Sequence, residues 1–597
     1  MKASTKLADK VIDSGVLVVG GAGAGLRAAI GAKEKGVRVT LISKGPVARS
    51  GASLLAGADL TLDGKSLHEL GFPGELRDTK QKFFKDIVTQ GFYLNNQRLV
   101  EIYVEDAPKR VKELLDWGIK VSFSEERAIF TSGSSILSAL LRRAKEIGVE
   151  TMDDIMLIGL LTKNGKVSGA LGLGIKTGDL IVFRSKAVVL ATGGWHKAYS
   201  PNAGSRELSG DGHAAAYRAG AKLANMEFVT FCCNVLLWPP KWRGIIFPYL
   251  LHLLVGGKLV NSKGDDFLSK YDPTIVKVGT SMEWNKSFVS IATTLEVLEG
   301  RGSPHGGVYY EADDMIWEEF ESRVTGHYPN WKYKGIDFSE LGEMLKGRKP
   351  VEVGSAAEYF EGGIAVNEKF ETSIPGLYAA GECTASLFGS NRVAAATTEM
   401  LVEGAIAGES AAEYVKKVEM PEIDERQVER LKEKALNPLK REGEVKPADL
   451  KNHIQRMAHE KLGPIRNREG VEEFIQFMET VKKNELPKLY TSSKSRRYNK
   501  EWIEALELEN IVQILEISAK SALTRTESRG VHYRSDYPHT DNDNWLKEII
   551  VKRVDDEIHT TTRAITVTKL PPPGGVVPYM EMMKKMMEAH SEIGGHH

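Results

Sequence analysis

A run of glycines and alanines, Gly20-Gly21-Ala22-Gly23-Ala24-Gly25, is the first segment whose spacing suits a chemical task. Glycines let the backbone turn tightly and bring N–H groups close to a pyrophosphate, whose charge is then favoured by the N-terminus of a following helix. The G-x-G-x-x-G spacing would place glycines at 20, 22 and 25, and Ala22 takes the middle place. The run predicts either a dinucleotide site with one departure from the pattern or a simple tight turn.

The segments on either side of this run favour the dinucleotide site. A short apolar β run, GVLVVG, precedes it, an alanine-rich helical segment follows, and a second β run, VRVTLISK, comes next. This order predicts a βαβ unit in which the two strands lie parallel. Ser43-Lys44 closes the second strand, where an acidic residue would often bind the ribose of NAD, so the sequence disfavours a simple NAD site.

Two later segments give the chain a family resemblance. Ala191-Thr192-Gly193-Gly194 ends a β run, and Gly376-Leu377-Tyr378-Ala379-Ala380-Gly381-Glu382 follows nearly two hundred residues later. With VVGGAGAGLRAA, they resemble segments of the flavoprotein subunits of the succinate dehydrogenase and fumarate reductase family. Further segments in the same order look like family counterparts: YLNNQRLVEIYVEDAPKRVKELLDWG, SGDGHAAAYRAGAKLANMEF, SPHGGVYYE, GPIRN and SRGVHYRSDYP.

The resemblance implies an α/β fold in which a Rossmann-like FAD-binding domain carries an inserted α+β capping domain and a helical C-terminal domain. We place the first part of the FAD-binding domain at 1–230, the capping domain at 231–355 and the second part at 356–420. Residues 421–530, strongly charged and helical in pattern, form the helical domain, and 531–597 a C-terminal extension, in which 530–575 has the pattern of short strands and turns.

The resemblance also implies which residues surround FAD. They are Gly20, Gly21, Gly23, Ala24, Gly25, Ser43, Lys44, Ser50, Gly51, Ala52, Thr192, Gly193, Gly194, Asp211, Gly381, Glu382, Arg392, Thr397 and Thr398. Asp211 and Glu382 carry carboxylates able to accept hydrogen bonds from the ribityl hydroxyls. For either acid the alternative is a helix N-cap.

Attachment of the flavin is expected to differ from that of many relatives. In them a histidine after an Arg-Ser pair binds the flavin covalently, whereas here Arg49-Ser50 is followed by Gly51. We therefore predict non-covalent FAD. Loss of that bond tends to lower the flavin potential, which favours reduction of a substrate.

The residues that bind succinate or fumarate in the family are mostly replaced. Cys232-Cys233-Asn234-Val235 stands where the family has His-Pro-Thr-Gly, and Leu253 stands where it has the proton-relaying arginine. Glu358 takes the place of a histidine, and only Arg392, in Gly389-Ser390-Asn391-Arg392, is retained. A buried dicarboxylate without cationic partners loses several kcal/mol per charge. The sequence therefore predicts that the protein is not a working succinate dehydrogenase or fumarate reductase.

Four residues are candidates for catalysis at the altered site: Glu358, Arg392, His252 and Cys232. Glu358 is an acid or base if burial raises its pKa, or else a carboxylate that is solvated or paired with Arg392. His252 is a neighbouring proton donor or a structural histidine. Cys232 is a redox thiol or an inert buried one.

The capping segments that face the flavin are apolar and aromatic: Cys232, Val235, Leu236, Leu237, Trp238, Phe247, Tyr249, Leu250, Leu251 and Leu253. One interpretation is a pocket for a bulkier, less charged substrate, such as an alicyclic or thioester-activated acid. The other is that these side chains pack the core of the cap or bind a partner subunit.

Composition narrows the remaining possibilities. The 597 residues are 42% hydrophobic and 27% charged, as in ordinary globular proteins, and 80 basic side chains balance 80 acidic ones, so bulk charge predicts no affinity for nucleic acid. Three cysteines cannot hold a four-cysteine iron–sulfur cluster, and no metal site is predicted. The longest apolar run, 244–260, is too short and interrupted to span a bilayer. We expect a cytoplasmic protein, free or bound to a membrane through a complex.

Three functions remain open. The leading one is a catalytic flavoprotein subunit that exchanges electrons with an iron–sulfur partner and acts on a small molecule other than succinate or fumarate. The second is a flavoprotein of the adenylylsulfate reductase type, and the third is a non-catalytic FAD electron relay. The SRGVHYRSDYP segment resembles family segments that pack near the iron–sulfur partner.

Overall fold

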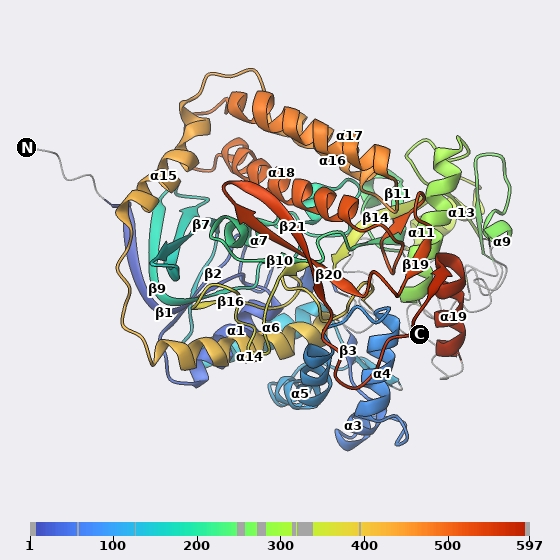
Figure 1. Ribbon diagram of the computed structural model, residues 1–597, viewed down its shortest axis with the longest axis horizontal. Helices are drawn as coiled ribbons and strands as arrows, with labels where there is room; N and C mark the ends of the chain where they lie inside the picture. Colours follow the sequence, from blue (N-terminus) through green and yellow to red (C-terminus); the bar gives the residue numbers. More distant parts are fainter. Residues whose placement is uncertain are drawn as a thin grey trace, which may run out of the picture.

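A computed structural model of the chain describes residues 7–56, 59–125, 127–247, 257–271, 282–312, 338–392 and 396–591, together with Glu318. Its centre is a seven-stranded sheet in the order β6-β2-β1-β9-β8-β7, with β16 paired to β9 (Figure 1). The strand pairs β1–β2, β1–β9, β2–β6 and β9–β16 are parallel. Strands β7, β8 and β9 form an antiparallel meander. The strands are β1 (Lys10–Val19), β2 (Val39–Ile42), β6 (Glu150–Met152), β7 (Ile155–Lys163), β8 (Lys166–Gly174), β9 (Leu180–Leu190) and β16 (Leu377–Ala379).

The predicted βαβ unit is present as β1, α1 and β2. Helix α1 (Gly23–Glu34) is buried along most of its length because it lies between the sheet and α14 (Ala396–Val415). Small residues permit this close packing: a Cβ added at Gly408 of α14 would lie 2.0 Å from the carbonyl oxygen of Ala28. Helices α5 (Gln97–Asp116) and α6 (Gly133–Glu146) complete this layer.

The capping domain is an antiparallel sheet with a helix on it. The sheet order is β11-β14-β13-β12, and α11 packs against β11 and β14. The elements are β11 (Val229–Trp238), β12 (Lys258–Val260), β13 (Val308–Glu311), β14 (Glu352–Phe360), α9 (Leu268–Tyr271), α11 (Met282–Leu298) and α13 (Phe338–Lys346). Strand β14 returns the chain to the FAD-binding domain, so its C-terminal residues lie beside the cofactor site.

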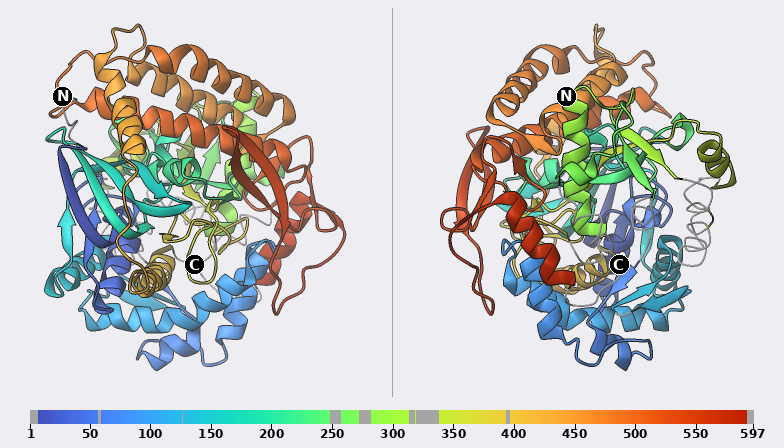
Figure 2. Two further views of the ribbon diagram at one scale, coloured as in Figure 1. Left: turned by 60° about the vertical axis from the view of Figure 1, so that its left-hand side comes forward. Right: turned by 90° about the vertical axis from the view of Figure 1, so that its right-hand side faces the viewer.

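Helices and a hairpin cover the other face of the central sheet (Figure 1). The helical domain consists of α15 (Glu425–Lys440), α16 (Pro447–Lys461), α17 (Arg468–Thr480) and α18 (Lys500–Thr524). Hairpin β20 (Lys547–Val554) and β21 (Glu557–Ala564) lies on the surface in both views of Figure 2. Helix α19 (Tyr579–Ser591) ends the described chain and packs Met582 and Met583 into the capping-domain core.

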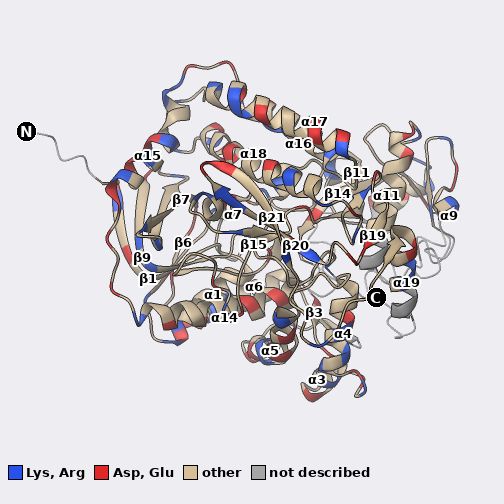
Figure 3. Ribbon diagram, viewed as in Figure 1, with Lys and Arg blue, Asp and Glu red and all other residues tan. Residues whose placement is uncertain are grey.

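The predicted fold class is therefore confirmed. Basic and acidic side chains are interspersed over the molecule (Figure 3), which agrees with the balanced composition. Among the described residues no helix is long and apolar enough to cross a bilayer.

Candidate functional site

The glycine turn between β1 and α1 leaves no room for larger side chains. Gly20 has a φ of +127°, and a Cβ added there would lie 2.0 Å from the carbonyl oxygen of Ala191. A Cβ at Gly25 would lie 1.8 Å from the carbonyl oxygen of Gly20. These contacts show that the glycines are needed to bring β1, α1 and β9 together, as the motif predicts.

The N-terminus of α1 is built to face an anion. The N-cap residue Ala22 supplies no side-chain acceptor to the amides of the first turn. Gly20, Gly21, Ala22 and Ala24 all line one cavity, so these amides and the positive end of the helix face the same space. Such an end binds phosphate groups well.

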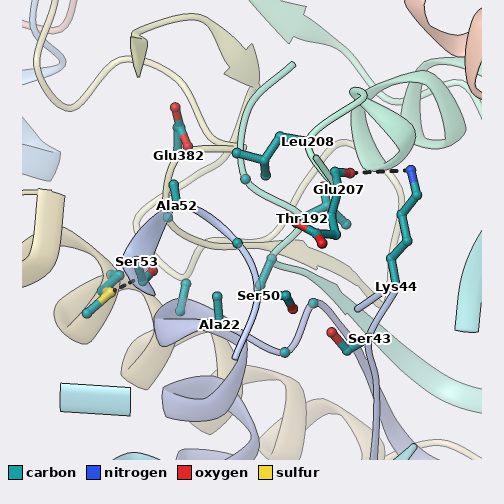
Figure 4. A pocket seen from close by; sticks show the side chains of 18 of the residues that line it. Ala22, Ser43, Lys44, Ser50, Ala52, Ser53, Thr192, Glu207, Leu208 and Glu382 are labelled. Atoms are coloured by element: carbon teal, nitrogen blue, oxygen red, sulfur yellow. Dashed lines mark hydrogen bonds between the residues drawn. The ribbon is translucent and has the colours of Figure 1, made fainter. Parts of the chain in front are cut away.

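This cavity has a volume of about 170 Å³ and is lined by chain segments far apart in the sequence (Figure 4). Of the predicted FAD-binding residues, the structure brings fourteen together on its wall: Gly20, Gly21, Ala24, Ser43, Lys44, Ser50, Gly51, Ala52, Thr192, Gly193, Asp211, Gly381, Glu382 and Thr397. Gly23, Gly25, Gly194, Arg392 and Thr398 lie outside the wall. Three further wall residues, Ala22, Ala191 and Ala380, belong to the motif segments found in the sequence. Wall residues missed by sequence reasoning are Val19, Gly45, Ser53, Ala56, Ile155, Leu157, Glu207, Leu208, Tyr359, Ala396, Glu399 and Met400.

Lys44 and Asp211 form an ion pair at one side of the cavity. Lys44 Nζ lies 2.8 Å from a carboxylate oxygen of Asp211 and 2.7 Å from one of Glu507 on α18. Burial alone lowers the pKa of Lys44, but the two carboxylates outweigh it and raise the pKa above its ordinary value. Asp211 also accepts hydrogen bonds from Ser209 and Asn510, so its carboxylate is held in place.

Neither acid caps a helix. Asp211 is the first residue of α7 (Asp211–Arg218), whose N-cap is Gly210, and Glu382 lies in a turn. The N-cap alternative is therefore wrong for both residues.

Glu382 is buried on the cavity wall. It accepts a hydrogen bond from the amide of Gly194 at 3.1 Å, and its other oxygen lies 3.6 Å from Nε2 of His196. Burial raises the pKa of Glu382 to about 8 and lowers that of His196 to about 4. At neutral pH the carboxyl group is therefore mainly protonated and able to donate a hydrogen bond, and the imidazole is neutral.

Two further carboxyl groups lie one helical turn apart on α14. Glu399 lines the cavity and accepts a hydrogen bond from the hydroxyl of Tyr359 at 2.6 Å. Glu403 accepts from the amide of Gly381 at 2.7 Å and from the hydroxyl of Thr384. Burial raises the pKa of Glu399 to about 8 and that of Glu403 well above its ordinary value. The sequence motifs gave no sign of this buried acid pair.

Glu358 and Arg392 lie near each other at the capping-domain side. Glu358, on β14, lines the cavity, and both its oxygens accept hydrogen bonds from Lys286 of α11, at 3.1 and 2.9 Å. The guanidinium of Arg392 lies over the ring of Tyr359, with its carbon 4.7 Å from the ring centre. The charges of Arg392 and Glu358 both act on Glu382. Sequence reasoning missed Lys286, because the segment around it carries no motif.

Of the other two catalytic candidates, Cys232 is not brought to the cavity. Cys232 is fully buried among apolar neighbours that include Val235 and Ala356, and it does not line the cavity. His252 and Leu253 lie outside the described residues, so a role for His252 stays a prediction.

Apolar residues of the cap pack its interior. Cys233, Leu236 and Phe247 belong to the capping-domain core, and Trp238 stacks on His305 with the ring centres 4.6 Å apart. None of the described apolar cap residues named from the sequence lines the cavity. Their arrangement agrees with the core-packing interpretation and not with an apolar substrate pocket.

Family models match most of the chain. A model described as "FAD binding domain" matches residues 15–130 and 124–398, and one described as "Fumarate reductase flavoprotein C-term" matches residues 451–578.

Individual relatives match over almost their whole length. The chain is 29% identical to a subunit of "Fumarate reductase (CoM/CoB)" from Methanothermobacter marburgensis, covering 90% of this chain and 97% of that protein. It is 30% identical to an uncharacterized FAD-dependent oxidoreductase of Methanocaldococcus jannaschii, covering 90% and 96%. The solved structure of Mycobacterium smegmatis Sdh1 in complex with UQ1 superposes with a TM-score of 0.82 at 30% identity, covering 94% and 96% of the two chains. Adenylylsulfate reductase from Archaeoglobus fulgidus shares the fold at 20% identity, with a TM-score of 0.74 and coverage of 94% and 97%.

Proposed function

Because the chain belongs to the succinate dehydrogenase and fumarate reductase flavoprotein family, we propose that it is a catalytic subunit whose substrate is neither succinate nor fumarate. It is an FAD-dependent oxidoreductase. The proposal concerns its substrate, its electron partner and the roles of its residues.

The residues of the cavity fit FAD. The glycine turn and the uncapped N-terminus of α1 suit the pyrophosphate, and Asp211 and Glu382 offer carboxyl groups to hydroxyls of the cofactor. Bound FAD supplies two-electron chemistry toward the substrate and one-electron chemistry toward a partner. The chain's own residues position the cofactor and hold protons at Glu382 and Glu399.

The charge of the cavity wall carries the proposal about the substrate. Among the described wall residues five are acidic, namely Glu207, Asp211, Glu358, Glu382 and Glu399, and one, Lys44, is basic; Glu382 and Glu399 hold protons at neutral pH, so the negative charge comes from the other three. Lys44 is already paired with Asp211 and Glu507. A dicarboxylate placed here would lose its hydration and gain little cationic compensation, at a cost of several kcal/mol.

A substrate less charged than succinate or fumarate is therefore favoured. The wall gives no support to the idea that this substrate is also larger than they are. Of the apolar cap residues that suggested a large pocket, Cys232, Val235, Leu236 and Phe247 pack in apolar clusters of the cap. The substrate we expect is a compound with at most one carboxylate.

An iron–sulfur protein is the proposed electron partner. Among the described residues no group of three or more His, Cys, Asp or Glu side chains is placed to hold a metal. Cys232, Cys233 and Cys383 are all buried and form no disulfide in the described structure. Single electrons leaving FAD therefore need an acceptor on another chain.

The experiment is anaerobic mixing of the photoreduced protein with fumarate, a panel of enoyl thioesters and monocarboxylic enoates, and adenylylsulfate. Flavin reoxidation, followed by stopped-flow absorbance, is the signal. We expect reoxidation by at least one singly charged or neutral alkene and none by fumarate. Rapid turnover of fumarate would overturn the proposal, and reoxidation by adenylylsulfate alone would replace it with the adenylylsulfate reductase type. If no compound reacts but a co-purified iron–sulfur protein does, the chain is an electron relay.

A further inference from the structure

Glu403 of α14 bonds to both ends of the turn that carries Glu382. Its Oε2 accepts a hydrogen bond from the amide of Gly381 at 2.7 Å and another from the hydroxyl of Thr384 at 2.9 Å. The amide of Thr384 donates to the carbonyl oxygen of Gly381 at 2.8 Å, which closes a four-residue turn. Glu382 is the second residue of this turn and lies on the cavity wall, and Glu403 is not among the described residues that line the cavity.

The carboxyl group of Glu403 holds this turn without bringing a charge into the interior. It is buried, and its other oxygen, Oε1, has no hydrogen-bond partner among the residues that the structure describes. A negative charge shared with that oxygen would lose its hydration without compensation, so a proton on Oε1 is favoured. Burial and the charge of Glu399 raise the pKa of Glu403 well above its ordinary value, which agrees with a neutral group. A glutamine can replace a neutral group of this kind.

Glu403 can fix the turn because α14 is itself fixed against α1. At the next residue of α14, Gly404, an added Cβ would lie 2.6 Å from the carbonyl oxygen of Ala24. The turn reaches the same place, since Gly381 has a φ of +74° and a Cβ added to it would lie 2.8 Å from the Cβ of Ala24. Glu403 therefore joins the turn to the junction of α1 and α14.

The position of the Glu382 carboxyl group follows from the position of this turn. Its Oε2 accepts from the amide of Gly194 at 3.1 Å, and its Oε1 lies 3.6 Å from Nε2 of His196. A turn displaced by about 1 Å would lose the hydrogen bond from Gly194, because such bonds weaken steeply beyond their ordinary length. The carboxyl group would then no longer be held at its place on the cavity wall.

We propose that Glu403 is a positioning residue for the cofactor, which binds both ends of the turn at 381–384 to α14 and thereby sets where Glu382 meets FAD. The inference rests only on the placement of Glu382 at the cofactor, so it is independent of the substrate and the electron partner proposed above. Because Glu403 acts through Glu382, its effect on FAD affinity should depend on the presence of the Glu382 carboxyl group.

The test is a double-mutant cycle on the affinity for FAD. The FAD-free protein is titrated with FAD, and quenching of flavin fluorescence gives the Kd. Glu403→Met removes both hydrogen bonds to the turn and should raise the Kd of the parent protein about tenfold. In a Glu382→Ala background the same substitution should raise the Kd by less than about threefold, because the side chain through which Glu403 acts is absent.

A conservative variant separates the hydrogen bonds from the shape of the side chain. Glu403→Gln keeps an oxygen that accepts from Gly381 and Thr384, so the Kd for FAD should stay within about threefold of the parent value. Hydrogen–deuterium exchange at residues 380–384 of the holoprotein should be faster in Glu403→Met than in Glu403→Gln. Glu413→Met removes an exposed glutamate of the same helix and is the matched control, which should leave the Kd unchanged.

Thr384→Val is a second variant that decides the question where Glu403→Met does not fold. It removes only the hydrogen bond from the hydroxyl to Glu403 Oε2 and leaves the bond from the amide of Gly381 in place. The Kd for FAD should rise about threefold in the parent protein and stay unchanged in the Glu382→Ala background. Thermal unfolding of the FAD-free forms measures the stability of each variant separately from its affinity for FAD.

Two results would overturn the positioning role. One is an equal fold-change in Kd with and without the Glu382 carboxyl group, which would show that Glu403 and Thr384 only stabilise the fold. The other is a loss of affinity in Glu403→Gln as large as that in Glu403→Met, which would show that the acceptor oxygen is not what holds the turn. No substrate enters these measurements, so the outcome of the reoxidation experiment neither supports nor contradicts this inference.

Discussion

Gly51 decides how the flavin is attached. It has a φ of +83°, in the region that favours glycine, and a Cβ added to it would lie 3.0 Å from the Cβ of Ala22. Acid denaturation of the purified protein should therefore release all the flavin into the supernatant, because no side chain at this position can bond to it. A yellow protein pellet would contradict the prediction. Gly51→His should lose FAD affinity through backbone strain rather than gain a covalent bond.

Glu382 should make stability depend on pH. Burial raises its pKa from 4.5 to about 8, so between these values the folded protein binds a proton that the unfolded chain does not. Its contribution to the free energy of unfolding is full below pH 4.5 and is lost as the pH rises through about 8, at about 1.4 kcal/mol per pH unit. Glu382→Gln stays neutral, so the thermal unfolding temperature of its FAD-free form should fall less over this range than that of the parent.

The two profiles must be compared in the same buffers without flavin, since Glu361 and Glu399, with pKa values also raised to about 8 by burial, add similar slopes in both proteins. Identical slopes for the parent and Glu382→Gln would show that this carboxyl group does not titrate as its burial requires.

Sequence alone could locate the residues tied to backbone geometry and not those tied to tertiary electrostatics. Gly20 and Gly193 belong to glycine-rich turns that indicate a nucleotide site, and both lie on the cavity wall as the sequence predicts. Lys286 was missed because its role depends on α11 packing over β14, a contact between residues more than seventy positions apart. The buried pair of Glu399 and Glu403 was missed for the same reason, since a glutamate on a helix is ordinarily solvated.

The packing of α14 on α1 links one element to cofactor affinity. A Cβ at Gly408 would lie 2.0 Å from the carbonyl oxygen of Ala28, so Gly408→Ala must push the helices apart. Because Ala396, Thr397, Glu399 and Met400 at the start of α14 line the cavity, we expect the Kd for FAD to rise about tenfold or more. Quenching of flavin fluorescence on binding measures it. Gly470→Ala on α17, where the nearest atom would be 3.2 Å away on a side chain, is the matched control and should bind FAD normally.

Two side chains of α5, Gln97 and Glu101, hold the segment that follows β21, and Gln97 makes most of the bonds. The side-chain oxygen of Gln97 accepts hydrogen bonds from the amides of Thr568, Lys569 and Leu570, each at 3.0 Å, and its nitrogen donates to the carbonyl oxygen of Leu570. Gln97→Ala should lose all four and lower the free energy of unfolding by about 2–4 kcal/mol. Hydrogen–deuterium exchange should become faster at residues 568–570.

Gln97→Glu tests the hydrogen-bond acceptor separately from the donor. The new side chain keeps an oxygen that accepts from the three amides and loses only the hydrogen bond donated to the carbonyl oxygen of Leu570. Its exchange at residues 568–570 should stay close to that of the parent. Equally faster hydrogen–deuterium exchange in Gln97→Ala and Gln97→Glu would show that the shared acceptor oxygen does not fix the segment.

The domains of the molecule are joined by buried polar groups as well as by a shared apolar core. Lys44 of the FAD-binding domain meets Glu507 of the helical domain, and Arg525 at the end of α18 is bonded to Glu227 beside the cap. The segment that resembled a partner-binding motif belongs to this interior: Arg529, His532 and Arg534 are fully buried. It supports the cofactor site from behind, since the amide of Val531 donates to the carbonyl oxygen of Ser390, and it does not offer these side chains to another chain.

An iron–sulfur partner therefore has to be tested on the assembled protein. The isolated chain should contain flavin but no acid-labile sulfide, and when fully reduced it should give no iron–sulfur signal in electron paramagnetic resonance, because its three cysteines are buried and do not form a metal-binding group in the described structure. Affinity purification from the native source should yield a complex that contains sulfide and shows cluster signals at the potential where the flavin is reduced. A native preparation free of iron, yet able to have its flavin reduced by a two-electron donor and reoxidised by an alkene, would place the electron source in solution instead of in a partner.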